Sequence, residues 1–218
     1  MKTVKQISIT LLLIFTNIIL FAQNDSMPKY YNSDPTIAYL KTAKFKIGTG
    51  VLIPQNGLKE YFGISPIIEL RIEFPLKQNK SLEFSVQTIV PNQEESFRYI
   101  RDLDTINAKA TLMINPILRF KKYFIKTKKS DLNLNVGFGI SVIQTNARNL
   151  FYEGKEGQKK YETITAFLAS PGIEYSYKFN NEELSVGFNV QYAPYKIEGS
   201  LRENLGTIFY TPKIAYKF

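Results

Sequence analysis

The sequence predicts an all-β fold, an eight-stranded antiparallel up-and-down transmembrane β-barrel, and three observations lead to it. Apolar and polar residues alternate along eight segments, a proline motif recurs in every second segment, and short connections alternate with long ones. With 44% hydrophobic and 22% charged residues in a chain of 218, the composition is that of a folded protein. Together these observations indicate sequential hairpins whose strands cross a common apolar layer.

The alternation is clearest in residues 131–145. Every second residue from Leu132 to Val142 is apolar, and the residues between them are Asn, Gly or Ser. This two-residue period is typical of a strand with one apolar face, and no segment shows a long helical stripe. The eight segments with this pattern are 44–54, 64–74, 81–91, 110–121, 131–145, 164–178, 184–195 and 205–218.

The proline motif places Pro66, Pro116, Pro171 and Pro212 in the second, fourth, sixth and eighth segments. The repeating unit is therefore one hairpin, whereas a propeller blade would need four strands in the same span. Each proline precedes the aromatic end of its strand by six to eight residues, or ~20 to 26 Å at ~3.3 Å per residue. We therefore expect the prolines near the far edge of the apolar band, where a missing N–H is tolerated.

The connections alternate in length. Those at 75–80 and 179–183 are short and that at 122–130 is intermediate, while the longer ones cover 55–63, 92–109, 146–163 and 196–204. Short periplasmic turns and longer extracellular loops are typical of transmembrane barrels.

Small residues on the polar face and aromatic residues at the strand ends favour a membrane barrel over a soluble one. Glycine and serine suit a crowded lumen, and two aromatic girdles are expected at the membrane interfaces. The expected girdle at the short turns is Phe74, Tyr123, Phe124, Tyr175, Tyr177, Phe179, Tyr216 and Phe218, and that at the long loops is Tyr192, Tyr195 and Tyr210. A secreted soluble ligand-binding barrel is the alternative.

The N-terminus predicts export. Residues 1–22 combine Lys2 and Lys5 with an apolar run that is too short to span a membrane, which is typical of a signal peptide. We expect residues 23–43 to form an N-terminal periplasmic segment and residues 44–218 to form the outer-membrane barrel. Removing the two lysines lowers the formal charge from +9 to +7.

Histidine and cysteine are both absent from the sequence. Their absence excludes a Ser-His-Asp triad, thiolate chemistry, imidazole or thiolate metal sites and disulfides. We therefore expect no enzyme activity, no cofactor and no metal site. The compartment and the lack of a motif also argue against a nucleic-acid partner.

The signal ending in Phe21-Ala22-Gln23, the eight alternating segments and the terminus Tyr216-Lys217-Phe218 resemble the small outer-membrane β-barrel proteins of Bacteroidota-type bacteria, including the PorT-like family. This resemblance implies the cell outer membrane of a Gram-negative bacterium, with outer-membrane lipid around the barrel. It also implies an accessory role beside a secretion or envelope-assembly machine. Tyr216 and Phe218 are expected to form the assembly signal read by the barrel-assembly machinery.

Charged residues recur on the face opposite to the apolar one. In a lumen that eight strands just fill, we expect them to form an ion-pair network. The candidates are Glu69, Arg71, Glu73, Glu83, Arg119, Glu174 and Lys213, and the same parity carries Lys46, Lys121 and Lys178. The network is interpreted either as a plug whose charges satisfy one another or as a gated path.

The loops are the expected functional surface. The partner-binding candidates are Phe97, Arg98, Tyr99, Arg101, Arg148, Phe151 and Tyr152, since aromatic and arginine side chains suit a protein or glycan interface; solvated loops against lipopolysaccharide are the alternative. A basic turn that can meet anionic phospholipid headgroups carries Lys121, Lys122, Lys126, Lys128 and Lys129.

The sequence thus predicts a non-enzymatic integral outer-membrane barrel. Its expected role is a structural or accessory component of an envelope or secretion assembly, with the loops contacting an envelope protein partner. A narrow channel for small solutes or ions is a second hypothesis.

Overall fold

The computed structural model describes residues 42–76, 79–100, 105–156, 158, 160–180, 182–195 and 207–217. The compact unit considered below spans Ala43–Phe218. The expected signal peptide, nearly all of the N-terminal segment, Arg101 and Phe218 lie outside the described residues.

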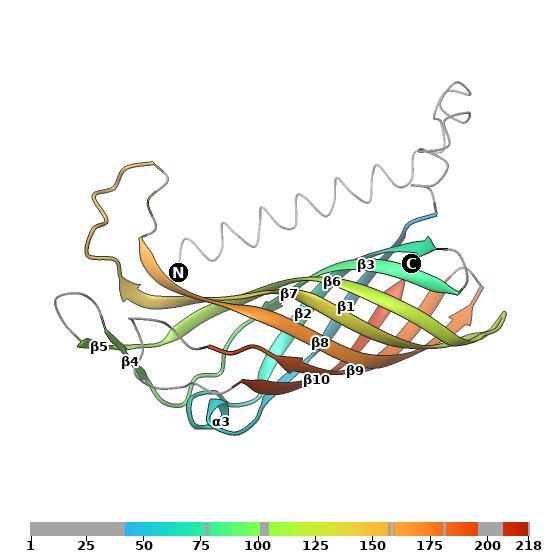
Figure 1. Cartoon of the computed structure of the whole chain (residues 1–218), viewed down its shortest axis with the longest axis horizontal. Helices are drawn as coiled ribbons and strands as arrows, with labels where there is room; N and C mark the ends of the chain where they lie inside the picture. The colour runs from blue at the N-terminus through green and yellow to red at the C-terminus, as the bar shows by residue number, and fades with distance from the viewer. Residues whose placement is uncertain are drawn as a thin grey trace. The chain divides into compact units, whose positions relative to one another are not determined.

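Eight strands form one closed barrel (Figure 1). Each pairs antiparallel with its two neighbours, and the first strand pairs with the last. The strands are β1 (Lys44–Pro54), β2 (Ser65–Leu76), β3 (Lys80–Ile89), β6 (Ala110–Lys126), β7 (Ser130–Arg148), β8 (Tyr161–Phe179), β9 (Glu182–Tyr192) and β10 (Ile208–Lys217). The predicted all-β, eight-stranded antiparallel barrel is therefore confirmed.

Three short elements lie in the longer connections and were not predicted. They are the one-turn helix α3 (Leu58–Tyr61) and the hairpin of β4 (Phe97–Ile100) with β5 (Thr105–Ala108). Each has four residues, which is too few for a periodic pattern to show. No helix in the described part of the chain is long and apolar enough to cross a membrane.

The three central strands are longer than predicted. β6 has 17 residues, and β7 and β8 have 19 each. The pairing of β7 with β8 continues to Arg148 and Tyr161. In Figure 1 this part of the β7–β8 hairpin extends past the neighbouring strands at the end where α3 and β4–β5 lie.

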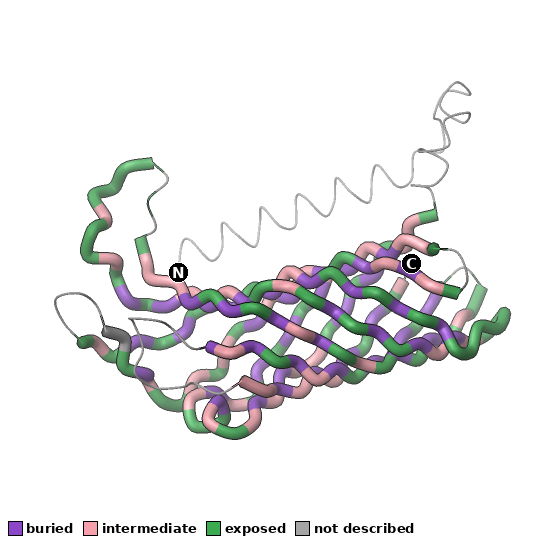
Figure 2. Tube along the Cα trace, viewed as in Figure 1, coloured by how far each residue is buried: buried purple, intermediate pink, exposed green. Residues whose placement is uncertain are grey.

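Buried and exposed residues alternate along the barrel strands (Figure 2). The outward-facing residues are large and apolar. On β7 they are Leu134, Val136, Phe138 and Ile140, which are 44–55% exposed, and equivalent residues occur on the other seven strands. The barrel therefore presents an apolar belt to its surroundings.

The recurring prolines lie inside this apolar belt, not at its edge, so that expectation was wrong. Pro171 pairs with Val136, which stands between Leu134 and Phe138. On the side of Pro171 that faces β9, the pairing is interrupted, because the paired residues skip from Ala169↔Tyr192 to Gly172↔Asn189. Similar interruptions occur beside Pro116 and Pro212. Each of these three prolines stays paired with one neighbouring strand. Its pairing with the other neighbouring strand is interrupted, because proline has no N–H to donate there.

Candidate functional site

The lumen is filled by three kinds of side chain in succession. Ion pairs occupy the short-turn half, amides and hydroxyls follow, and a hydrophobic cluster fills the end beneath the long loops. The strand period decides which residues line the lumen, because each inward residue belongs to the parity opposite to the apolar belt.

The ion-pair network contains five bases and five glutamates, none more than 5% exposed. They come from every barrel strand except β7. The bases are Lys46, Arg71, Arg119, Lys121 and Lys213, and the acids are Glu69, Glu73, Glu83, Glu174 and Glu183. Equal numbers of the two signs make the network formally neutral, which suits a site where an unpaired charge would be costly.

Glu69 is the meeting point on one side of the network. Its Oε1 lies 2.8 Å from Arg119 Nη1, its Oε2 accepts a 2.6 Å hydrogen bond from Arg71 Nε, and Lys213 Nζ lies 3.2 Å from Oε2. Gln87 Nε2 donates to Oε1 at 3.0 Å. One carboxylate thus holds three bases from three strands.

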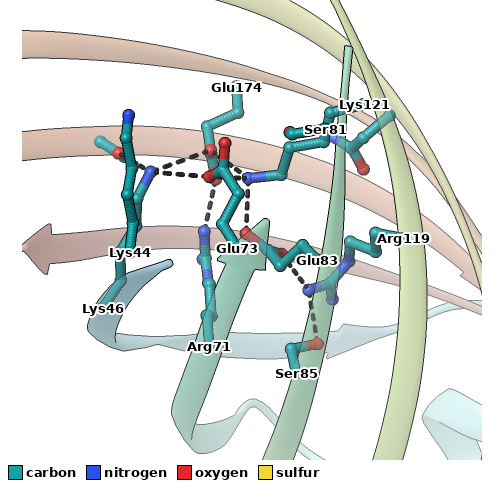
Figure 3. A network of polar contacts seen from close by, with 12 residues as sticks. Lys44, Lys46, Arg71, Glu73, Ser81, Glu83, Ser85, Arg119, Lys121 and Glu174 are labelled. Carbon is teal, nitrogen blue, oxygen red and sulfur yellow. Dashed lines mark hydrogen bonds and ion pairs between the residues drawn. The ribbon is translucent and has the colours of Figure 1, made fainter. Parts of the chain in front are cut away.

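Lys121 is the corresponding hub on the other side. Its Nζ lies 2.5 Å from Glu83, 2.9 Å from Glu174 and 3.3 Å from Glu73. Figure 3 shows Lys46 and Lys121 approaching Glu73 and Glu174 from opposite sides. Four of the five bases, Lys46, Arg71, Arg119 and Lys121, each contact more than one carboxylate, so their ion pairs are interdependent, whereas Lys213 contacts Glu69 alone.

Arg71 joins the two hubs, because it also pairs with Glu174. Lys46 Nζ extends the network to Glu183 at 2.7 Å, and Lys44 reaches the same carboxylate at 3.2 Å. The seven predicted lumen residues are thus brought together with Lys46 and Lys121.

Sequence analysis missed Glu183, although a signal for it was present. The predicted segment began one residue later, at 184, yet Glu183 has the inward parity of Ser185. Lys178 also differs from expectation. It pairs with Asp131 at 2.6 Å with its side chain 23% exposed, and is not part of the central network.

Amides and hydroxyls form the middle of the lumen. Gln191 Nε2 donates to Gln87 Oε1 at 3.1 Å, and Asn189 Nδ2 donates to Asn135 Oδ1 at 2.8 Å. The second bond passes over Gly172, where a Cβ would overlap the Asn189 amide. A side chain at this position would therefore block the hydrogen bond that joins β7 and β9 across β8.

A hydrophobic cluster closes the lumen at the loop end. Leu58, Phe62 and Phe97 from the long connections are at most 2% exposed and pack with inward residues of the strands. The two connections are tied together, since Gly63 N–H donates to the Asn92 carbonyl at 2.7 Å and the Glu94 N–H donates to the Tyr61 carbonyl at 2.9 Å. The loop end is thus sealed by apolar side chains, which sequence analysis did not predict.

Four predicted positions are corrected by these contacts. Phe97 is buried and so is not available as a partner-binding residue. Tyr123 and Tyr195 point into the lumen, where they bond to Glu73 and Ser141, and neither belongs to a lipid-facing girdle. Lys121 belongs to the network and not to the surface of the basic turn.

The remaining loop candidates lie in two places. Arg98 is exposed on β4 of the β4–β5 hairpin, and the side chain of Tyr99 lies outside the described residues. Arg148 and Phe151 are exposed on the extended β7–β8 hairpin, with Phe151 67% exposed, and Tyr152 is half-buried. The candidates are therefore not gathered in one patch. Tyr216, of the expected assembly signal, faces outward on β10 and is 36% exposed.

Among the described residues, no group of three or more acidic side chains is arranged to hold a metal ion. The five network glutamates are each engaged by bases.

The sequence matches no protein-family model and no curated protein. Among solved structures, the chain is similar to Neisserial surface protein A (NspA), with 8% identity and a TM-score of 0.53 over 80% of this chain and 95% of that one. It is also similar to Ail of Yersinia pestis, with 10% identity and a TM-score of 0.41 over 81% of this chain and 97% of that one. A third similar structure is the N-terminal β-barrel domain of Pseudomonas aeruginosa OprF, with 12% identity and a TM-score of 0.39 over 80% of this chain and 97% of that one.

At 8% identity, the likeness to NspA is a likeness of fold. The protein thus has a closed eight-stranded antiparallel barrel, the fold that it shares with NspA. The resemblance to the PorT-like family stays a prediction.

Replacing Glu69 with Gln is expected to destabilise the barrel by about 3–5 kcal/mol, because Lys213 and two arginines lose a buried partner. The matched control is Glu153→Gln, which removes the carboxylate of the exposed Lys155–Glu153 pair and should change stability little. Urea unfolding in phospholipid vesicles, followed by circular dichroism because the chain has no Trp, measures both. Equal effects of the two substitutions would contradict a stabilising network.

Proposed function

We propose that this protein is a non-enzymatic integral outer-membrane β-barrel, closed to solutes, that serves as a structural or accessory component and presents its loops to a partner. The single observation that carries the proposal is a barrel with an apolar outside and a filled inside. The outside suits lipid, the described inward side chains fill the inside, and the loops are left as the surface for recognition.

The apolar belt has the height that a membrane requires. On β8 the outward residues are apolar or aromatic from Phe167 to Tyr177, a span of ten residues. At ~3.3 Å per residue and a tilt of ~40°, this corresponds to about 25 Å along the barrel axis, the height of the lipid-facing band in transmembrane barrels. Soluble monomers rarely expose a continuous apolar surface of this size.

A lysine placed in this belt distinguishes a membrane barrel from a soluble one. Phe138 is 55% exposed on β7 and Phe151 is 67% exposed in the following loop. Phe138→Lys should be less stable than Phe138→Ala by about 2–4 kcal/mol in bilayers, whereas Phe151→Lys and Phe151→Ala should be alike. The measurement is urea unfolding in vesicles. Recovery of the mature wild-type chain in soluble form without detergent would support the secreted soluble barrel instead.

The lumen favours a closed barrel over a narrow channel. A permeant ion would have to pass both the hydrophobic seal around Phe62 and the paired charges around Glu69. Eight strands enclose only enough space for side chains, and here that space holds two successive plugs.

Planar-bilayer recording tests the closed lumen. We expect no steady conductance from the purified wild-type protein, with a reconstituted porin as the positive control for the assay. A steady conductance that Arg119→Gln alters would show that ions pass the network and would favour the channel hypothesis.

The absence of enzyme activity is part of the proposal. A general acid or base needs a carboxyl group that can gain or lose a proton beside a substrate. The network glutamates instead lie among bases, behind the hydrophobic seal and away from solvent.

The β7–β8 hairpin is the better supported partner surface. Leu150 and Phe151 are 44% and 67% exposed at its tip, and Arg148 and Lys160 flank them with positive charge. Exposed aromatic and arginine side chains are enriched in protein interfaces. A place beside a secretion or envelope-assembly machine is suggested by the PorT-like resemblance alone.

Co-purification from native membranes tests this surface. Arg148→Ala/Phe151→Ala should lower the recovery of a specific partner several-fold, because it removes side chains from the hairpin tip. Lys128→Ala/Lys129→Ala, at the opposite end of the barrel, should not. A partner recovered equally with both variants would contradict the assignment to the hairpin.

A further inference from the structure

We propose that the short-turn end of β3 and β6 binds the headgroup of an anionic phospholipid through Lys80 and Lys122, assisted by Lys128 and Lys129 of the adjoining turn. The site rests on the membrane location proposed above and adds a ligand class to it.

Lys80 and Lys122 stand directly opposite each other in the β3–β6 pairing. Both face outward, because Ser81 and Lys121, the adjacent residues on each strand, are buried in the lumen. Like charges directly opposite on one face of a sheet are destabilising. An anion between the two ammonium groups would convert this repulsion into two attractive contacts.

The pair lies within apolar surroundings. The next outward pair toward the membrane centre is Leu82↔Phe120, and on the turn side Phe124 and Ile125 are 58% and 49% exposed. Lys122 Nζ lies 5.6 Å from the centre of the Phe124 ring. A lysine stem along an apolar surface with its ammonium group at the interface is the arrangement that meets a lipid phosphate while its acyl chains contact the belt.

The adjoining turn holds further lysines in a fixed position. Thr127 accepts a hydrogen bond from the Ser130 N–H at its Oγ1 and donates its own N–H to the Ser130 carbonyl, both at 2.8 Å. Lys128 and Lys129 are exposed at the tip, and the Lys129 carbonyl accepts a 2.7 Å bond from the N–H of Lys178 on β8. The backbone that carries the charges is therefore anchored to the barrel wall.

No carboxylate within the described residues forms an ion pair with Lys80, Lys122, Lys128 or Lys129. The acid nearest along the chain, Asp131, is buried and paired with Lys178 at 2.6 Å. The basic character is also local, since the turn end of β9 carries the exposed Glu182. Such a cluster attracts anionic lipid over zwitterionic lipid.

The short-turn end is expected to face the periplasm, so the occupant to which we commit is a bilayer phospholipid. Phosphatidylglycerol is a suitable probe because it combines a single phosphate charge with acyl chains that reach Phe120 and Leu82.

The test uses the full mature chain in phosphatidylcholine vesicles, with spin-labelled phosphatidylglycerol or phosphatidylcholine reporting the lipid held at the barrel surface. The wild type should prefer phosphatidylglycerol, and Lys80→Gln/Lys122→Gln should lower that preference by at least about fivefold. Lys155→Gln/Lys160→Gln makes the same charge change in the loop at the other end and should leave the preference intact. If the first double variant does not insert, Lys122→Gln alone should give the smaller loss.

Insertion of the wild type without a preference for phosphatidylglycerol would overturn the site and leave the membrane location standing. Equal losses in the two double variants would also overturn it, since the effect would then come from total charge. Failure of the wild type to insert in either lipid would overturn both proposals.

Discussion

Five buried bases and five buried glutamates can share one narrow lumen only because each has a partner of opposite sign on another strand. This electrostatic balance is the constraint on which the rest of the barrel depends. It requires small residues beside the long ones, so that the side chains can lie across the wall. At Gly137, for example, a Cβ would lie only 2.9 Å from Arg119 Cγ and 2.8 Å from Ile117 Cγ2. A larger residue there would compete with the Arg119 side chain for the same space.

The same balance separates the two faces of the sheet. Charge is concentrated inside, while the outer face is apolar over a height that matches a membrane. The loop end needs no charge, because α3 and the β4–β5 connection bring Leu58, Phe62 and Phe97 over the lumen. The interior thus changes from ionic to apolar along the axis, and each end is closed by the side chains that suit its surroundings.

Strand parity made much of the barrel predictable. The two-residue period separates Glu69 and Arg119 from the apolar belt, and it accounts for the pairing of side chains far apart in the chain. The girdle prediction was wrong where it relied on closeness to a strand end and not on strand parity. Tyr123 and Tyr195 were assigned to girdles because they lie near strand ends, although they have the inward parity of Lys121 and Gln191. Phe97 lies in a loop, where no period applies, and its burial depends on contacts with the distant α3.

The distribution of the network over the chain has a consequence for how the barrel is built. Lys213 on β10 meets Glu69 on β2, 144 residues earlier, and Lys46 on β1 meets Glu183 on β9, 137 residues later. Until the first and last strands meet, Lys213 and Glu183 lack their partners, so an unclosed sheet would leave these two charges unpaired. In the outer-membrane location proposed for this protein, insertion and closure would therefore be coupled, because an incomplete barrel would carry unpaired charge into the lipid.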